Sequence, residues 1–97
     1  MILVLGSLVA RPETLDTVVE LSRAHVERSR SEEGCLEHGV SVDLENPLRL
    51  VFVERWRDRD ALDAHFALES SRDFVRAVHP LVAEPPSLDI FPVVAQA

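Results

Sequence analysis

Two segments of the sequence, Ile2–Ala10 and Leu48–Trp56, carry apolar residues at adjacent positions and not only at alternate ones. Successive side chains of a strand point to opposite faces, so both faces of these two expected strands are apolar. A sheet with helices on one face only would leave the other face as a large exposed apolar patch. The sequence therefore predicts a homodimer in which two sheets face each other.

The remaining segments alternate between helical and strand patterns around these two strands. In chain order they are a helix within residues 11–30, a strand over 35–45, a turn at 45–47, two helical segments at 58–68 and 70–83, and a last strand within 85–94. Pro12 suits a helix start, Gly34 is expected to stop the first helix, and Asp58 is expected to cap the second. The order β-α-β-β-α-β predicts an α+β fold, a single ferredoxin-like domain over residues 1–97 with an antiparallel sheet.

The composition excludes several classes of function. A formal net charge of −7 argues against nucleic-acid and membrane partners, which bind clustered positive charge. All ten basic residues are arginine, so lysine nucleophiles and Schiff bases are excluded. Cys35 is the sole cysteine, which favours a reducing, cytoplasmic compartment. The apolar N-terminal segment ends at Arg11, too early for a membrane span, and it lacks the basic start of a signal peptide.

Several cofactor motifs are missing from the sequence. It has no glycine-rich phosphate loop, no HExxH, no paired cysteines and no GxSxG. The four histidines do not have the spacing of metal ligands. We therefore expect neither a metal nor an organic cofactor.

The strongest candidates for a site lie at the end of the third expected strand and on the helix that follows. Phe52, Glu54 and Trp56 share one face of the strand. If that face meets the helices, Trp56 lies near the mouth of the layer between sheet and helices, and His65 approaches from the next helix. A mostly apolar cavity with a few polar groups is typical of a small-molecule site.

Each candidate also has a purely structural interpretation. Trp56 can be the largest core side chain, and His65 a hydrogen-bonded histidine at the edge of the core. Glu54 can pair with an arginine such as Arg72 or Arg76. His25 is expected to pack or cap, because nothing near it in the sequence suggests a site.

Three stretches, "EEGCLEHGVSVDLENP", "FVERWRDRDALDAHF" and "FVRAVHPLVAEPPSLDIFPV", resemble the antibiotic biosynthesis monooxygenase (ABM) domain family in this order. The resemblance covers nearly the whole chain, and the pattern E-x-W-x-D-x-x-A-L-x-x-H over residues 54–65 is its most specific part. It implies a dimeric α+β barrel. It also implies oxidation of quinol-like or polyketide aromatics by molecular oxygen without metal or flavin. Some relatives degrade haem, and others isomerise or act on small signalling molecules.

The chain departs from the family at some positions. His38 stands where a tyrosine is frequent, and the histidine that many members carry near Ser70 is absent. The haem-degrading branch is similar at Trp56 but has an asparagine near Ser7 and a histidine near Val78 or His79. Ser7 breaks that pattern, so haem is not expected.

These observations predict a cofactor-independent monooxygenase acting on a small aromatic substrate. The base or anion partner would be His65 or His38, with Trp56 as a stacking wall and Ser7 as a hydrogen-bond donor. Glu54 would orient a histidine or an arginine. The other residues expected to bind substrate are Phe52, Phe66, Phe74 and His79. A non-catalytic small-ligand-binding dimer remains the main alternative, followed by haem degradation.

Overall fold

The computed structural model describes residues 1–94 and 96, which form an α+β fold with one four-stranded sheet. Helices and strands follow each other as the sequence predicted, with the second helical region divided in two. In chain order the elements are β1 (Ile2–Val9), α1 (Leu15–Ser29), β2 (Cys35–Val42), β3 (Arg49–Trp56), α2 (Arg59–Ala67), α3 (Glu69–Val78), the 3-10 turn η1 (His79–Leu81) and β4 (Ser87–Pro92).

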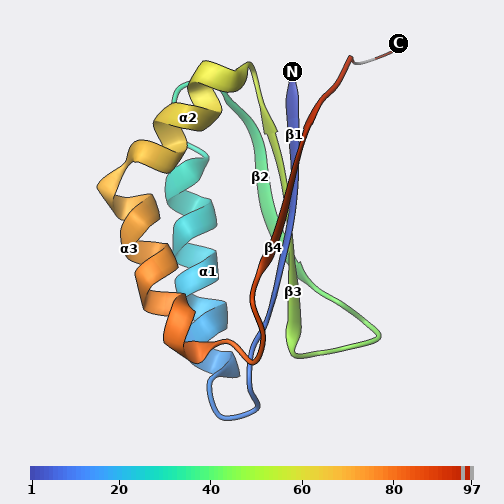
Figure 1. Cartoon of the computed structure of the whole chain (residues 1–97), viewed down its shortest axis with the longest axis vertical. Helices are drawn as coiled ribbons and strands as arrows, with labels where there is room; N and C mark the ends of the chain where they lie inside the picture. Colours follow the sequence, from blue (N-terminus) through green and yellow to red (C-terminus); the bar gives the residue numbers. More distant parts are fainter. Residues whose placement is uncertain (95, 97) are drawn as a thin grey trace.

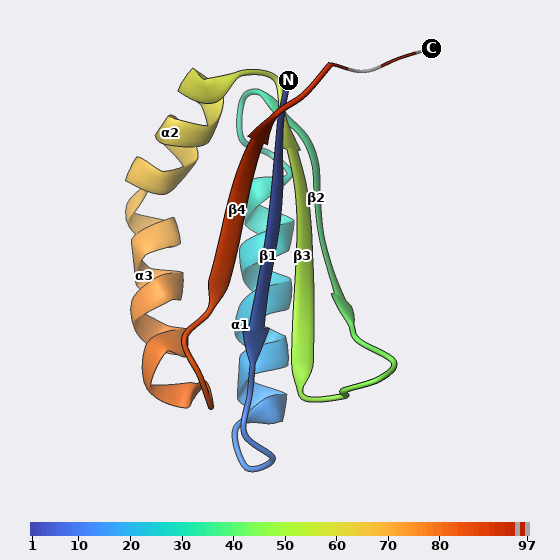
Figure 2. The same ribbon diagram turned by 45° about the vertical axis from the view of Figure 1, so that its right-hand side comes forward.

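The sheet has the strand order β2-β3-β1-β4, and every neighbouring pair is antiparallel. The long helix α1 and the pair α2 and α3 cover one face of this sheet (Figure 1). The other face is free of helices, as the turned view shows (Figure 2). The predicted ferredoxin-like arrangement is therefore confirmed. None of the described helices is long and apolar enough to cross a membrane.

The ends of α1 differ from the prediction. The helix begins at Leu15, three residues after Pro12, and it ends at Ser29, five residues before Gly34. The Ser29 hydroxyl donates a 2.7 Å hydrogen bond to the carbonyl of His25, and residues 30–34 continue as a turn. Gly34 has φ +82°, and a Cβ there would lie 2.5 Å from the Cβ of Ala61. Glycine is therefore needed where this turn passes α2.

Asp58 caps α2, as predicted. Its carboxylate accepts a 2.9 Å hydrogen bond from the backbone N–H of Ala61, which satisfies one of the free donors at the helix start. Leu68, with extended backbone angles, then ends α2 and precedes α3. The cap fixes where α2 begins, and thereby which face of it carries His65.

The core between the sheet and the helices contains two groups of buried apolar side chains. One is centred on β1, α1 and β3 and the other on Trp56. The first comprises Leu8, Ala10, Val18, Val26, Leu50 and Phe52, and the second Val4, Trp56, Ala61 and Leu62. Burial alternates along β3, so Leu50, Phe52, Glu54 and Trp56 all point toward the helices, as predicted.

The helix-free face of the sheet is apolar at its centre. Leu5 pairs with Val53 across β1 and β3, and Leu3 pairs with Phe91 across β1 and β4. Leu5 is 39% exposed and Phe91 is 43% exposed. Together with Val51, these residues form what we call the outer apolar face. Its existence confirms the two-faced pattern of β1 and β3 in the sequence.

Candidate functional site

Four polar side chains from four elements meet in the buried layer between sheet and helices. They are His25 from α1, His38 from β2, Glu54 from β3 and His65 from α2, and each is less than 9% exposed. The ring centres of the three histidines are 5.2 to 5.5 Å apart. Burying polar groups is costly unless they are paired, so this cluster marks the part of the core most suited to a function.

Glu54 is held by its neighbours on the sheet. One oxygen of its carboxylate accepts a 2.9 Å hydrogen bond from the indole N–H of Trp56 and lies 3.3 Å from Nε2 of His38. Burial alone would raise the pKa of Glu54, but the His38 contact and the indole outweigh it and hold this pKa below its usual value. The carboxylate therefore remains ionised inside the protein at neutral pH.

The suggested pairing of Glu54 with Arg72 or Arg76 is wrong. Both arginines are exposed on α3, and Arg76 pairs instead with Asp73. Glu54 lies on the inner face of a central strand, underneath the helices. It therefore meets ring nitrogens from within the layer and not side chains from the solvent face of α3.

His65 is oriented by a carboxylate from another part of the chain. Its Nδ1 lies 2.8 Å from Oε1 of Glu32, and the Ser71 hydroxyl lies 3.5 Å from the same nitrogen. An ionised carboxylate only accepts hydrogen bonds, so Nδ1 carries the proton and donates it to Glu32. In the neutral ring with this tautomer, Nε2 is the nitrogen that can accept a proton. The ring is 3% exposed and packs against Trp56 at 4.7 Å between centres.

His25 packs in the core, as expected, but it does so within the polar cluster, which its sequence neighbours did not suggest. Its ring stacks on Phe74 with centres 4.2 Å apart and planes 8° from parallel. Burial, followed by the nearby His38 and His65, lowers the pKa of His25 to about 3. The helical spacing of α1 puts His25 on the buried stripe beside Val26, but the strands that face it are distant in sequence and give no local signal.

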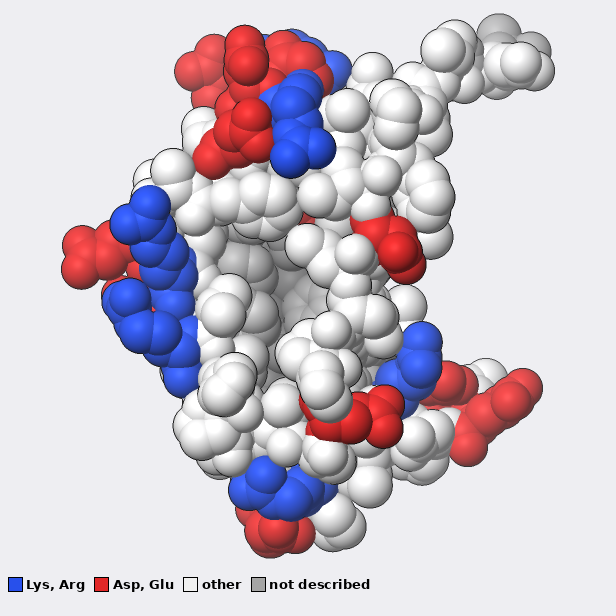
Figure 3. All heavy atoms as spheres, viewed as in Figure 1, with Lys and Arg blue, Asp and Glu red and all other residues white. Residues whose placement is uncertain are grey.

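A cavity of about 270 Å³ opens beside this cluster, between the α2–α3 pair and the strands β1 and β4. Figure 3 shows a hollow in this part of the surface, bordered by uncharged residues, with the charged side chains around the periphery. Most lining residues are apolar. Of the predicted site residues, those that border the cavity are Ser7, Phe52, Glu54, His65, Phe66, Phe74 and His79.

Two predicted site residues lie behind the cavity wall. Trp56 is fully buried in the core and is not among the described residues that line the cavity, and neither is His38. Trp56 therefore packs against His65 with the two rings tilted by 36° and donates its indole N–H to Glu54, where the sequence suggested a wall for substrate. His38 contacts the cavity only through Glu54 and the other histidines.

Ser7 borders the cavity, but its side chain lies on the helix-free face of the sheet. It pairs with Val51 in the sheet register, and paired residues share a face. Its hydroxyl lies 2.8 Å from that of Ser87 on β4. The hydroxyl thus already has a partner on the side of the sheet away from the helices.

Three residues of the site were missed by sequence reasoning: His25, Glu32 and Ser71. Glu32 lies in the charged turn after α1 and resembles any solvated residue in the sequence. Only the path of this turn beneath α2 brings its carboxylate to His65.

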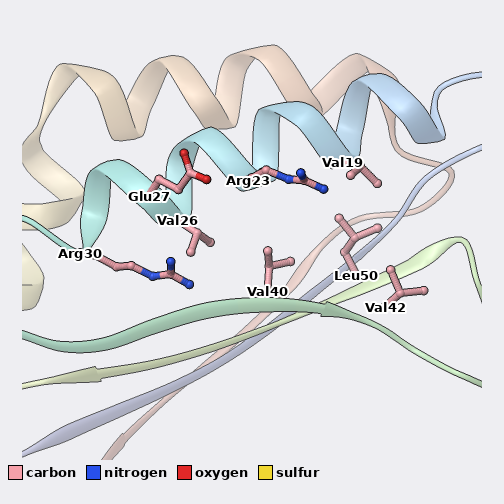
Figure 4. Close-up of a pocket in the computed structure, with 8 residues that line it drawn as sticks. All are labelled: Val19, Arg23, Val26, Glu27, Arg30, Val40, Val42 and Leu50. Carbon is pink, nitrogen blue, oxygen red and sulfur yellow. The ribbon is translucent and has the colours of Figure 1, made fainter.

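A second hollow of about 240 Å³ lies between α1 and the β2 edge of the sheet. Its floor is apolar, and the charged residues Arg23 and Glu27 of α1 and Arg30, which follows α1, lie along its helical side (Figure 4). These three residues are exposed. Arg30 is also engaged, since its Nε donates a hydrogen bond to the carbonyl of His38. This hollow lacks the buried polar cluster that distinguishes the first.

Comparison with known proteins identifies the family. The sequence profile described as antibiotic biosynthesis monooxygenase (ABM) matches residues 1–77. The chain belongs to the ABM family. Among solved structures, an antibiotic biosynthesis monooxygenase is 33% identical with a TM-score of 0.90, over 98% of this chain and 100% of the other. A Deinococcus radiodurans protein described as a candidate monooxygenase of this kind is 26% identical, with a TM-score of 0.95 over 100% of this chain and 96% of that one.

A curated relative extends beyond the ABM chain described here. The uncharacterised protein sll1783 of Synechocystis is 33% identical over 92 residues, which is 95% of this chain and 63% of that protein. The chain thus spans less than two thirds of this relative. Membership of the ABM family supports a monooxygenase or small-molecule-binding role, and the apolar cavity beside buried polar groups agrees with either.

Proposed function

We propose that the protein oxidises a small, electron-rich aromatic compound, such as a hydroquinone or an anthrone, with molecular oxygen and without a cofactor. The observation that carries this proposal is the placement of His65. Its ring borders an apolar cavity, and its Nδ1–H is fixed on Glu32, which leaves Nε2 as a proton acceptor. A base oriented by a carboxylate in this way is suited to removing a proton from a bound hydroxyl.

The cavity suits a single small ring system. Its volume of about 270 Å³ is near the lower limit for small-molecule sites, and the aromatic side chains of Phe52, Phe66 and Phe74 line it. Aromatic walls favour a flat ligand, and their low polarity excludes water from the reacting atoms. These features support an aromatic substrate over a charged or highly hydrated one.

The reaction is balanced with the substrate as the only reductant. Nε2 of His65 takes a proton from the substrate, and the resulting anion transfers electrons to dioxygen. A carbon–oxygen bond then forms to give a hydroperoxide. His65 returns its proton to the peroxide. Loss of the remaining C–H proton at the oxygenated carbon then breaks the oxygen–oxygen bond, so that one oxygen atom stays as the quinone carbonyl and the other leaves with both protons as water. The substrate supplies all four electrons, so the scheme requires no metal or flavin.

The buried residues behind the cavity have supporting roles in this proposal. Glu54 stays ionised between Trp56 and His38, and its negative charge stabilises positive charge on the nearby imidazoles. Trp56 holds Glu54 through a hydrogen bond and the ring of His65 through a tilted ring-to-ring contact. In this proposal His65 is the catalytic base, and Trp56 and His38 are positioning residues.

We also infer that the protein acts as a homodimer in a reducing, cytoplasmic compartment. The outer apolar face supports the dimer, since exposed patches of this kind mark association surfaces. ABM proteins are commonly dimeric. The single cysteine, partly buried with its pKa raised by burial, supports the compartment.

Oxygen uptake tests the reaction. Hydroquinones and anthrones are supplied without added cofactor, and uptake is measured above the rate of autoxidation. The variant His65→Gln retains a hydrogen-bonding side chain but cannot act as the base, so turnover should fall by about a hundredfold or more. The control Asp63→Asn alters an exposed residue of the same helix, paired with Arg59, and should leave turnover unchanged.

Two results contradict the proposal. If His65→Gln keeps most of the activity, His65 is not the base. If the wild type binds the same compounds saturably and consumes no oxygen above autoxidation, the protein is a small-ligand-binding module.

A further inference from the structure

The three buried histidines are arranged like a set of metal ligands. One ring nitrogen from each of His25, His38 and His65 lies within 4.8 Å of the others. We propose that these three side chains form a binding site for a divalent transition metal ion such as Zn²⁺. The proposal goes beyond the oxidation described above and does not depend on it.

The separation of the nitrogens is compatible with coordination after small ring movements. Zinc–nitrogen bonds of about 2.0–2.1 Å place two tetrahedral ligand nitrogens about 3.3 Å apart. Closing from 4.8 Å requires each nitrogen to move by about 1 Å, which rotation of the rings about their side-chain bonds can supply. The ligands come from α1, β2 and α2, so the sequence shows no metal-binding spacing, although the fold assembles the set.

His38 is a buried polar group that lacks a full set of partners. Neither of its ring nitrogens makes a hydrogen bond of ordinary geometry within the described structure, although Nε2 lies 3.3 Å from Glu54. Leaving such a group unsatisfied in the core typically costs about 1–3 kcal/mol. A metal ion bound to one ring nitrogen of His38 would satisfy that nitrogen, while the carboxylate of Glu54 faces the other one.

Carboxylates already stand behind two of the three rings. Glu32 accepts from Nδ1 of His65, and Glu54 lies beside Nε2 of His38. Metal-binding histidines almost always use their second nitrogen in this way, which fixes the ring and strengthens it as a ligand. His25 is held in place by its stacking on Phe74.

The site is accessible and its charge is favourable. His25 and His65 both border the cavity, which gives an ion a route inward and leaves room for a water molecule or small ligand in the fourth position. The ionised Glu54 partly neutralises the double positive charge of the metal. Three neutral imidazoles favour Zn²⁺, Co²⁺, Ni²⁺ or Cu²⁺ over Mg²⁺ or Ca²⁺, which prefer oxygen ligands.

Metal binding has a consequence for the proposed oxidation. A metal ion that takes the free nitrogen of His65 removes the proton acceptor, so zinc should inhibit oxygen uptake. The metal-free and metal-bound forms would then be the active and inactive forms of the same site.

Zinc titration followed by NMR of the histidine side chains tests the site directly. The chain has four histidines, so ¹⁵N-histidine labelling of tag-free protein gives the Nδ1 and Nε2 signals of four imidazole rings. We expect zinc to shift three of them at one equivalent and leave His79 unchanged, because His79 lies outside the cluster. An unchanged spectrum at excess zinc, or a shift of His79 alone, would overturn the proposal.

Calorimetry with Zn²⁺ provides the second measurement. The variant His38→Gln, which does not alter the proposed base, should weaken zinc binding by at least about tenfold, and Glu54→Gln by about 10- to 100-fold. His79→Gln is the matched control and should bind like the wild type. Equal affinity in all folded variants would contradict the site. The wild-type NMR result stands even if a core variant fails to fold.

The outcomes separate this proposal from the proposed function. Zinc binding by the three rings with no oxygen uptake under any condition would support the metal site and remove the oxidation. Oxygen uptake that needs His65 and is unaffected by zinc would support the oxidation and remove the metal site.

Discussion

At the scale of single residues, the sequence predicted which side chains are buried better than it predicted their partners. Alternation along β3 correctly placed Glu54 on the inner face. The choice between an arginine and a histidine as its partner depended on which residue of β2 lies opposite it, and the sheet register makes that residue His38. His25 is a similar case, because its burial follows from helical spacing while its neighbours come from long-range packing.

His25 leads to a prediction about acid stability. Its pKa is about 3 in the folded protein and 6.5 ordinarily, so below pH 6.5 the unfolded chain binds a proton that the folded protein does not. Stability should therefore fall as the pH drops from 6.5 toward 3. As the pH falls from about 7.5 to about 5, protonation of His25 in the unfolded chain should lower the free energy of unfolding by about 2 kcal/mol.

Urea unfolding at these two pH values, with EDTA and at fixed protein concentration, measures the effect. The variant His25→Gln lacks the titrating group, so its loss of stability between the two pH values should be smaller than that of the wild type by this amount. An equal loss in both proteins would show that His25 is protonated as readily in the folded state as in the unfolded chain.

At the scale of elements, local chemistry predicted the start of α2 better than either end of α1. The cap at Asp58 was recognisable because an acidic residue preceded a helical pattern and the acceptor lies within one turn. The end of α1 was placed too late, because Gly34 was taken as the stop signal. In the structure α1 already ends at Ser29. Gly34 instead allows the following turn to pass close to Ala61, where a side chain would not fit.

The cap gives a prediction about α2, the helix that carries His65. Asp58→Ala removes the acceptor for the Ala61 N–H and should lower the urea midpoint, whereas Asp58→Asn retains an acceptor and should restore most of it. The backbone hydrogen bond from Ala61, followed by Arg57, lowers the pKa of Asp58. The cap's charge-dependent contribution is thus present above the ordinary carboxyl pKa and is lost as the pH falls through the lowered value.

Midpoints measured at neutral and at acidic pH check this prediction. The difference between wild type and Asp58→Ala should be larger at neutral pH. Identical midpoints at neutral pH would mean that the start of α2 is held by packing and not by its cap.

At the scale of the whole molecule, the sequence showed that the sheet has two apolar faces, and the structure shows which residues make up the outer one. Helices cover the inner face, where the site lies. Within the described residues no element covers the outer apolar face. The arrangement of a second copy on this face is beyond what strand patterns can predict, because it depends on the shapes of two surfaces and not on periodicity.

The proposed dimer leads to the last prediction, made at the centre of the outer apolar face. Val53 lies between Leu5 on β1 and Gly39 on β2, so a charge there would be buried wherever two such faces meet. An unpaired buried charge is strongly unfavourable, so Val53→Asp should dissociate the dimer at micromolar concentration.

Leu44→Asp, at a loop position that is 98% exposed, is the matched control for the added charge. Light scattering should give about twice 10.9 kDa for the wild type and the control and about 10.9 kDa for Val53→Asp. If the wild type is itself a stable monomer, or if Val53→Asp stays dimeric while folded, the outer apolar face is not the interface.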